Sequence, residues 1–221
     1  MEDFGNIINW ENVHKNSEAF KKCPIPRYGF VEEFFERKFY EKLYETWPNE
    51  GGEGWIRVEG DYSRSAMRRS FGKNTNDDSL RDEDDPNLSK EWNKFRRYMK
   101  TDEFVNNVAK YTGIPLKKVV IAGFTALFKG DFNLVHNHFE ESSIGMVEYD
   151  LSMFFYFSKN WQKGDPGGTY MASEEDESSI IFETCNLDNT MFCFQESQKS
   201  WHGTRYITKD VVRRAVGIML K

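Results

Sequence analysis

The stretch VHNHFE, residues 135–140, spaces three potential metal ligands two positions apart. Alternate side chains of an extended segment point to the same face, so His136, His138 and Glu140 would project on one side. Imidazole and carboxylate groups that share a face form a chelate suited to Fe(II) or a similar divalent ion. We therefore predict that this stretch is extended and contributes ligands to a metal site.

A further ligand is expected from the C-terminal third of the chain. His202 lies in SWHGT and follows the apolar run NTMFCF, which is typical of a strand. Two neighbouring ligands and one distant histidine are the layout of a facial triad, which leaves one side of the ion open. A His-x-His pair alone is more often a pair of solvated polar residues, so the prediction depends on the combination with His202.

The first half of the chain is rich in helical patterns. Residues 30–47 place apolar side chains at steps of three and four before Pro48, which predicts an amphipathic helix. A second helical segment is expected over about 91–111, closed by the turn residues 112–115. Residues 73–90 are charged and turn-rich, which predicts an exposed loop or a mobile lid.

The second half changes to short β-branched and aromatic runs separated by turn residues. The runs are VVIAGFTALF (119–128), GMVEYDLSMFFYF (145–157), GGTYMA (167–172), SSIIFET (178–184), NTMFCF (189–194) and RRAVGIML (213–220). Helices followed by many short strands predict an α+β fold whose strands form a sandwich or barrel. We expect one domain over residues 1–221, with about 1–115 as helix-rich support and about 116–221 as the strand core.

Composition narrows the class of protein. A net charge of -6 disfavours a surface that follows phosphate backbones, so nucleic acid is an unlikely partner. No apolar run approaches the roughly 20 residues that cross a bilayer, and no basic and then apolar leader opens the sequence. The three cysteines are odd in number and lack a CxxC spacing, which indicates reduced thiols. We expect a cytoplasmic protein without a membrane partner.

Five motifs in this order resemble the prolyl-hydroxylase-like branch of the 2-oxoglutarate and Fe(II)-dependent oxygenases over nearly the whole chain. They are PIPRYGFVEEFFERKFYEKLYETWP (24–48), FKGDFNLVHNH (128–138), DLSMFFYFSKNW (150–161) together with GDPGGTYMA (164–172), NTMFCFQESQKSWHGT (189–204) and RRAVGIML (213–220). The resemblance implies a double-stranded β-helix, a jelly-roll or cupin-like barrel, with N-terminal supporting helices. It also implies Fe(II), 2-oxoglutarate and O2 as cofactor and cosubstrates, with no catalytic residue beyond the metal ligands.

The sequence departs from the family at the metal ligands. The family usually has His-x-Asp, and counting from Gly130 places His136 at the histidine and His138 at the position of the aspartate. One ligand set is therefore His136, His138 and His202. A shift of two residues gives the His-x-Glu variant instead, with Glu140 as the alternative to His136.

The last strand-like run offers a group for a dicarboxylate cosubstrate, which needs a fixed cation at its distal end. Arg213 shares its strand face with Ala215 and Gly217, whereas Arg214 shares its face with large apolar residues. Small neighbours leave room for a ligand, so we select Arg213 as the cosubstrate-binding residue. Tyr156 resembles the family tyrosine that donates to the same carboxylate.

The activity implied by the resemblance is a dioxygenase that hydroxylates an amino-acid, peptide or protein, or small-metabolite substrate and releases succinate and CO2. Two alternatives stay open. GDFNLVHNH also fits the cupin spacing of a glycine, five residues and His-x-His, so a cupin-like metal-dependent dioxygenase that does not use 2-oxoglutarate is one. The other is a noncatalytic binding module that retained the barrel, because a fold alone does not specify chemistry.

Overall fold

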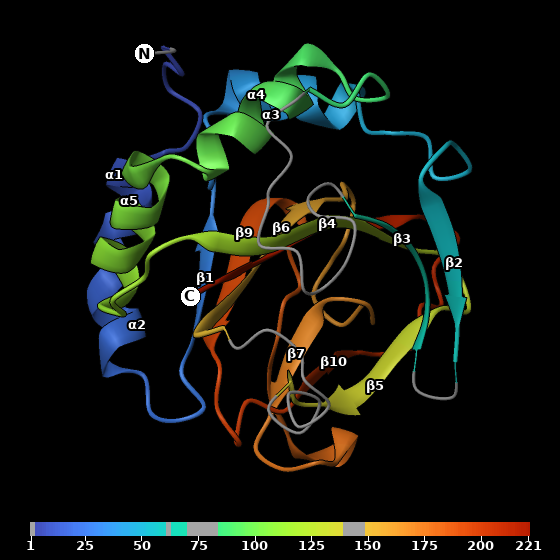
Figure 1. Cartoon of the computed structure of the whole chain (residues 1–221). Helices are drawn as coiled ribbons and strands as arrows, with labels where there is room; N and C mark the ends of the chain where they lie inside the picture. Colours follow the sequence, from blue (N-terminus) through green and yellow to red (C-terminus); the bar gives the residue numbers. More distant parts are fainter. Residues whose placement is uncertain (1–2, 61–62, 70–83, 139–148) are drawn as a thin grey trace.

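One curled antiparallel sheet forms the centre of the protein, with helices packed along its outer side (Figure 1). The structure, a computed structural model, describes residues 3–60, 63–69, 84–138 and 149–221. Within these residues the sheet has 11 strands in the order β1-β9-β6-β11-β4-β3-β5-β10-β7-β8, and β2 pairs with β3. Among the described residues, no helix has both the length and the apolar character needed to cross a bilayer.

The strands follow the expected runs closely in the second half of the chain. Their bounds are β1 (Tyr28–Glu32), β2 (Trp55–Glu59), β3 (Ser63–Arg69), β4 (Val119–Leu127), β5 (Phe132–His136), β6 (Leu151–Phe157), β7 (Thr169–Ala172), β8 (Ile180–Glu183), β9 (Asp188–Gln195), β10 (His202–Thr204) and β11 (Arg213–Leu220). The sheet curls so that β7 faces β6, β9 and β11 across a second apolar cluster, which includes Met171, Tyr156, Phe192 and Ala215. The prediction of an α+β fold with a jelly-roll, double-stranded β-helix is confirmed.

The helices are shorter than the sequence pattern indicated. Their bounds are α1 (Trp10–Lys15), α2 (Ser17–Lys22), α3 (Arg37–Glu45), α4 (Lys90–Met99), α5 (Asp102–Thr112) and the 3-10 helix η2 (Glu177–Ser179). Figure 1 shows α1, α2 and α5 along one margin of the sheet and α3 and α4 along the next. This layer covers the outer face of the strands.

The helix expected over 30–47 begins only at Arg37, so its first third was wrongly assigned. Residues 28–32 pair with β9 as strand β1, and Glu33 then takes a left-handed conformation with φ of 49° that ends the strand. Backbone pairing with a neighbouring strand outweighs the local apolar spacing there.

The helical segment expected over 91–111 is two helices. Thr101 accepts a hydrogen bond from the Phe104 amide and caps α5. One helix therefore ends after Met99 and a new one begins at Asp102. Gly113 ends α5 with φ of 75°, as the turn residues predicted. Within the charged stretch 73–90, residues 73–83 lie outside the described residues. Residues 84–89 lead into α4.

Strands β2 and β3 were missed by the sequence pattern. On β3 the alternate residues Ser63, Ser65 and Met67 line a cavity, so this strand lacks the apolar alternation that identifies a half-buried strand. The hairpin is tied to the turn before β5 by Arg57, whose Nη1 donates to Asp131 Oδ2 at 2.6 Å. Asp131 also accepts from the Phe128 amide at 2.9 Å and closes that turn.

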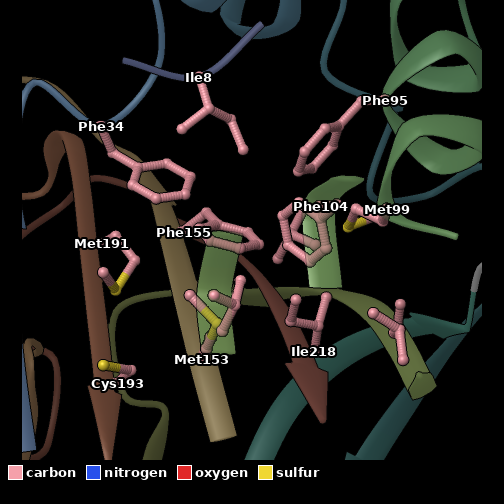
Figure 2. Packing of buried hydrophobic residues seen from close by; sticks show 14 of the residues in the cluster. Ile8, Phe34, Phe95, Met99, Phe104, Met153, Phe155, Met191, Cys193 and Ile218 are labelled. Atoms are coloured by element: carbon pink, nitrogen blue, oxygen red, sulfur yellow. The ribbon is translucent and has the colours of Figure 1, made fainter. Parts of the chain in front are cut away.

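The larger core lies between the helices and the outer face of the sheet, and Figure 2 shows residues of α4 and α5, such as Phe95 and Phe104, converging on strand residues such as Phe155. Phe155 of β6 stacks on Phe34 with ring centroids 4.8 Å apart and meets Phe95 of α4 edge to face at 5.7 Å. A dry aromatic layer of this kind supplies most of the burial that stabilises the fold.

A double glycine turn leads into β7. A Cβ atom at Gly168 would lie 1.7 Å from the Thr184 carbonyl oxygen, so only glycine fits beside this neighbouring chain. The Thr184 amide donates to the Thr169 carbonyl at 3.1 Å, and this contact aligns β7 with the segment after β8. The turn thereby places Thr169 at the start of β7, facing the interior of the barrel.

Candidate metal and cosubstrate site

The structure brings His136, His138 and His202 together. His136 ends β5, His202 begins β10, and these two residues are direct partners in the antiparallel register of the two strands. One ring nitrogen from each of the three histidines lies within 4.8 Å of those of the other two. The ring centroid of His202 is 4.3 Å from that of His136 and 4.6 Å from that of His138. The neighbouring His136 and His138 and the distant His202 therefore form one cluster.

Hydrogen bonds at Nδ1 fix how the three rings are presented. His136 Nδ1 lies 2.8 Å from the Leu134 carbonyl oxygen, and His202 Nδ1 lies 2.8 Å from the Ser200 carbonyl oxygen. A carbonyl only accepts, so Nδ1 carries the proton in both rings and Nε2 is the nitrogen with a lone pair. His138 Nδ1 lies 2.9 Å from Glu196 Oε1 and takes the same tautomer. This arrangement is the one that metal-binding histidines adopt.

The electrostatics of the cluster keep His202 neutral. Burial lowers the pKa of its imidazole well below the usual value, and the neighbouring His136 and His138 lower it further. A neutral imidazole is the form that binds a metal ion, whereas three mutually close imidazolium groups would repel one another. The cluster therefore offers imidazole nitrogens of the kind that bind Fe(II), Zn(II) and related ions.

The alternative ligand Glu140 lies outside the described residues. His138 and His202 belong to both of the ligand sets that the sequence left open. The set His136, His138 and His202 is the one for which the structure describes every member.

A cavity of about 230 Å³ opens beside the histidines, inside the barrel. All three histidines line it, together with apolar residues such as Leu127 and Met219. Arg213, the first residue of β11, lines the same cavity. The metal-ligand candidates and the cosubstrate-binding candidate therefore line one cavity.

Arg213 is a buried cation without a carboxylate partner among the described residues. Its exposed fraction is 3%, its Nε donates to the Gly167 carbonyl at 3.0 Å, and its Nη2 donates to Thr169 Oγ1 at 2.9 Å. Burial lowers the pKa of the guanidinium, while the contact with Tyr156 opposes that effect. Arg214 instead donates to Glu50 at 2.7 Å. A buried, unneutralised guanidinium in a cavity is a site for an anionic ligand.

Tyr156 lies behind the cavity wall and does not line the cavity. It is fully buried, and its hydroxyl donates to Thr169 Oγ1 at 2.7 Å. The ring lies 5.1 Å from the Arg213 Cζ atom. The described partner of the Tyr156 hydroxyl is therefore Thr169, and a direct contact between Tyr156 and the cosubstrate stays a prediction.

Thr169 is a site residue that the sequence did not single out. Its Oγ1 accepts from both Arg213 and Tyr156, which uses both lone pairs and leaves its own proton for an acceptor in the cavity. The signal that would identify it is its position directly after the double glycine of GDPGGT. Glu196 was missed as well, because a single acidic residue after an apolar strand resembles an ordinary strand end.

No protein-family model and no curated protein sequence matches the chain. Solved structures do match: the fold is similar to that of a prolyl-4-hydroxylase from Pseudomonas putida, with a TM-score of 0.65 and 11% identity over 96% of this chain and 98% of that one. A 2OG-Fe(II) oxygenase family oxidoreductase from Burkholderia pseudomallei has a TM-score of 0.62 and 10% identity over 96% and 91%. The Trichoplax adhaerens prolyl hydroxylase, solved with a hypoxia inducible factor oxygen degradation domain peptide fragment, has a TM-score of 0.58 and 9% identity over 96% and 88%.

These similarities extend over nearly the whole length of each chain. The protein therefore has the fold of the prolyl-hydroxylase-like 2OG-Fe(II) oxygenases, which agrees with the resemblance of its motifs. At identities of 9–13% the comparison establishes the architecture. The chemistry has to be argued from the residues of the cavity.

Proposed function

We propose that the protein is a non-haem Fe(II) and 2-oxoglutarate-dependent dioxygenase. The observation that carries this proposal is a single cavity lined by three converging histidines and by a buried arginine that no carboxylate of the described residues neutralises. A metal ion and a dicarboxylate are the two ligands that such a pair of features recognises. The proposed products from the cosubstrate are succinate and CO2.

Iron would be held by the Nε2 atoms of His136, His138 and His202, and Glu140 stays the alternative to His136. The residues fit a divalent ion because each described Nδ1 has an acceptor that turns Nε2 toward the cluster. When bound, Fe(II) supplies the redox chemistry with O2. The protein contributes the ring orientation and the dry surroundings.

Arg213 and Thr169 would bind the distal carboxylate of 2-oxoglutarate. The guanidinium offers charge, and the Thr169 hydroxyl offers one more hydrogen bond whose direction is fixed by Tyr156. Tyr156 is then a positioning residue for Thr169. The cavity volume of about 230 Å³ suits a small ligand, since drug-sized ligands need pockets of roughly 300–1,000 Å³.

The proposed substrate is an amino acid, a peptide or protein side chain, or a small metabolite, and the expected outcome is hydroxylation. The structure from Trichoplax adhaerens contains a peptide fragment, which supports the inclusion of peptides. One domain over residues 1–221 and a cytoplasmic location stay predictions.

The decisive experiment is an anaerobic titration of the metal-free protein with Fe(II) and then 2-oxoglutarate, following the visible charge-transfer band of an iron-bound 2-oxo acid. We expect a saturable band that is absent in His202→Ala and strongly weakened in Arg213→Met. Arg214→Met is the matched control, because Arg214 pairs with Glu50 and does not line the cavity. Tight iron binding without the band would favour the cupin-like alternative, and no iron binding would favour the noncatalytic module.

Two further variants separate the ligand sets. If His136 is a ligand, His136→Ala loses Fe(II) affinity and Glu140→Ala retains it. The opposite result would assign the His-x-Glu set.

A further inference from the structure

We propose that Glu196 is a positioning residue of the metal site, which supplies through His138 the negative charge that the His-x-Asp pattern places directly on the metal. This inference rests on the proposed function, because it assumes that His138 is a metal ligand. It assigns a role to a residue that lies in none of the ligand positions.

The contact between the two side chains is short and buried. Glu196 Oε1 lies 2.9 Å from His138 Nδ1, and the side chains of His138 and Glu196 are 12% and 5% exposed. A charge-assisted hydrogen bond at this distance and depth holds the imidazole in one orientation. It directs Nε2 of His138 toward the other two histidines.

The carboxylate is held by neutral donors on its other sides. Ser152 of β6 donates to Oε1, and Ser200 lies 3.4 Å from Oε2 through its hydroxyl. The Glu196 amide donates to the Asp150 carbonyl at 3.0 Å. No lysine or arginine of the described residues forms an ion pair with Glu196, so His138 is its only cationic or potentially cationic partner. The negative charge is therefore available to the imidazole and to whatever the imidazole binds.

His138 differs from the other two histidines in this respect. His136 and His202 donate from Nδ1 to neutral backbone carbonyls, whereas His138 donates to a carboxylate. A carboxylate behind a histidine makes its Nε2 more basic and strengthens the bond to a metal. The histidine with the charged partner is also the one at the position where the family pattern has its acid. Among the described residues, a carboxylate thus stands one residue further from the metal than in the family pattern.

The same short segment orients a second ligand. Ser200, four residues after Glu196, accepts from the Ser197 amide at 3.1 Å through its hydroxyl, and its carbonyl accepts from His202 Nδ1 at 2.8 Å. Residues 196–200 therefore form one hydrogen-bonded turn that supports His138 through Glu196 and His202 through the Ser200 carbonyl. This arrangement explains why a buried acid is tolerated at Glu196 in the absence of a cation from the described part of the chain.

The test uses Co(II) as the probe, with affinity measured by calorimetry and ligand geometry by the visible spectrum of the bound ion. Glu196→Gln is the informative variant, since an amide can accept from Ser152 and His138 through its oxygen and donate to Ser200. It removes the charge and retains the hydrogen bonds. Glu50→Gln is the matched control, because Glu50 is a similarly buried carboxylate that pairs with Arg214 outside the cavity, at 15% exposure.

We expect Glu196→Ala to weaken Co(II) binding by about 100-fold and Glu196→Gln by roughly 10-fold, in the range measured for outer partners of metal-binding histidines. The Gln variant should also shift the visible bands of bound Co(II), which a purely structural residue would not do. Parental affinity and an unchanged spectrum in Glu196→Gln would overturn the inference and leave the proposed function intact. A parent protein that binds no Co(II) would overturn both. The parent protein could also bind Co(II) with this dependence on Glu196 and yet show no charge-transfer band with Fe(II) and 2-oxoglutarate. That result would overturn the 2-oxoglutarate proposal alone.

Discussion

The two faces of the sheet are made by alternate residues of the same strands, yet they differ in almost every property. On β6, Met153 and Phe155 point into the aromatic core beneath the helices, whereas Ser152, Phe154 and Tyr156 point into the barrel. The outer face is packed with apolar and aromatic side chains of the larger core. The inner face keeps small and polar residues around a cavity.

Strand β11 shows the same division. Val216, Ile218 and Leu220 join the outer core, while Arg213 and Gly217 line the cavity. The comparison teaches that a two-residue period assigns stability to one set of positions and ligand binding to the other. Substitutions on the outer set should change the free energy of unfolding, and those on the inner set should change ligand affinity.

The largest expected effect lies on the outer face. Phe155→Ala removes a fully buried ring that contacts Phe34, Phe35 and Phe95, so we expect a loss of about 3–5 kcal/mol in the free energy of unfolding. Urea denaturation followed by circular dichroism measures this change. The folded variant should bind Co(II) with parental affinity. A loss below about 1 kcal/mol would contradict the assignment of stability to this face.

On the inner face, Arg213→Met should weaken 2-oxoglutarate binding to the Fe(II)-loaded protein by about 100-fold. The figure corresponds to about 2.7 kcal/mol, within the range for lost hydrogen bonds to a charged group. The free energy of unfolding should fall little, because the variant also removes a buried charge without a carboxylate partner. Retention of the parental affinity would show that the anion binds elsewhere.

A smaller effect is expected where the two faces meet at the double glycine turn. Gly168→Ala places a Cβ against the Thr184 carbonyl, and the required backbone shift should cost about 1–3 kcal/mol. The same shift displaces Thr169, so this variant should lose both stability and 2-oxoglutarate affinity. Thermal melting and the anaerobic titration measure the two losses. An effect on only one of them would separate the turn from the cavity.

The smallest expected effect belongs to neither face. Lys209 donates to Asp165 in the loop before β7, and this hydrogen bond lowers the pKa of the carboxyl below its ordinary value of 3.8. A carboxyl pKa that is lowered in the folded state stabilises that state at any pH above the ordinary pKa. This contribution disappears as the pH falls through the lowered pKa. Asp165→Asn should therefore cost at most about 1 kcal/mol at pH 7 and nothing in strong acid. Urea midpoints at pH 7 and pH 2.5 test this, and an equal cost at both would contradict it.

Much of this division could be predicted from the sequence, because a strand alternation is a local pattern. The apolar runs predicted β4, β6, β9 and β11, and the small neighbours of Arg213 indicated its face. The expectation that 135–140 is extended was wrong beyond His136, where β5 ends, so His138 joins the cluster from after the strand, and the curl of the sheet brings His202 beside both. Local patterns of this kind do not depend on the rest of the chain.

The features that the sequence did not predict depend on contacts between distant segments. Strand β3 carries Ser63 and Ser65 toward a cavity, so it has no apolar alternation to detect. Thr169 gained its role only when the turn placed it between Tyr156 and Arg213. Glu196 reaches His138 from 58 positions away, and no pattern around either residue indicates the pairing.

The three Nδ1 acceptors, two backbone carbonyls and one carboxylate, belong to the folded chain itself. The orientation of the rings is thus set by hydrogen bonds of the protein, in contrast to small zinc domains, in which metal binding itself supplies the folding energy. Under the proposed function, three nitrogen donors would exert little choice among first-row ions, because such donors generally bind nickel, copper and zinc more tightly than iron. The ion that fills the site would then depend on which metals surround the newly folded protein, so its metallation history would decide whether a given molecule can react with oxygen.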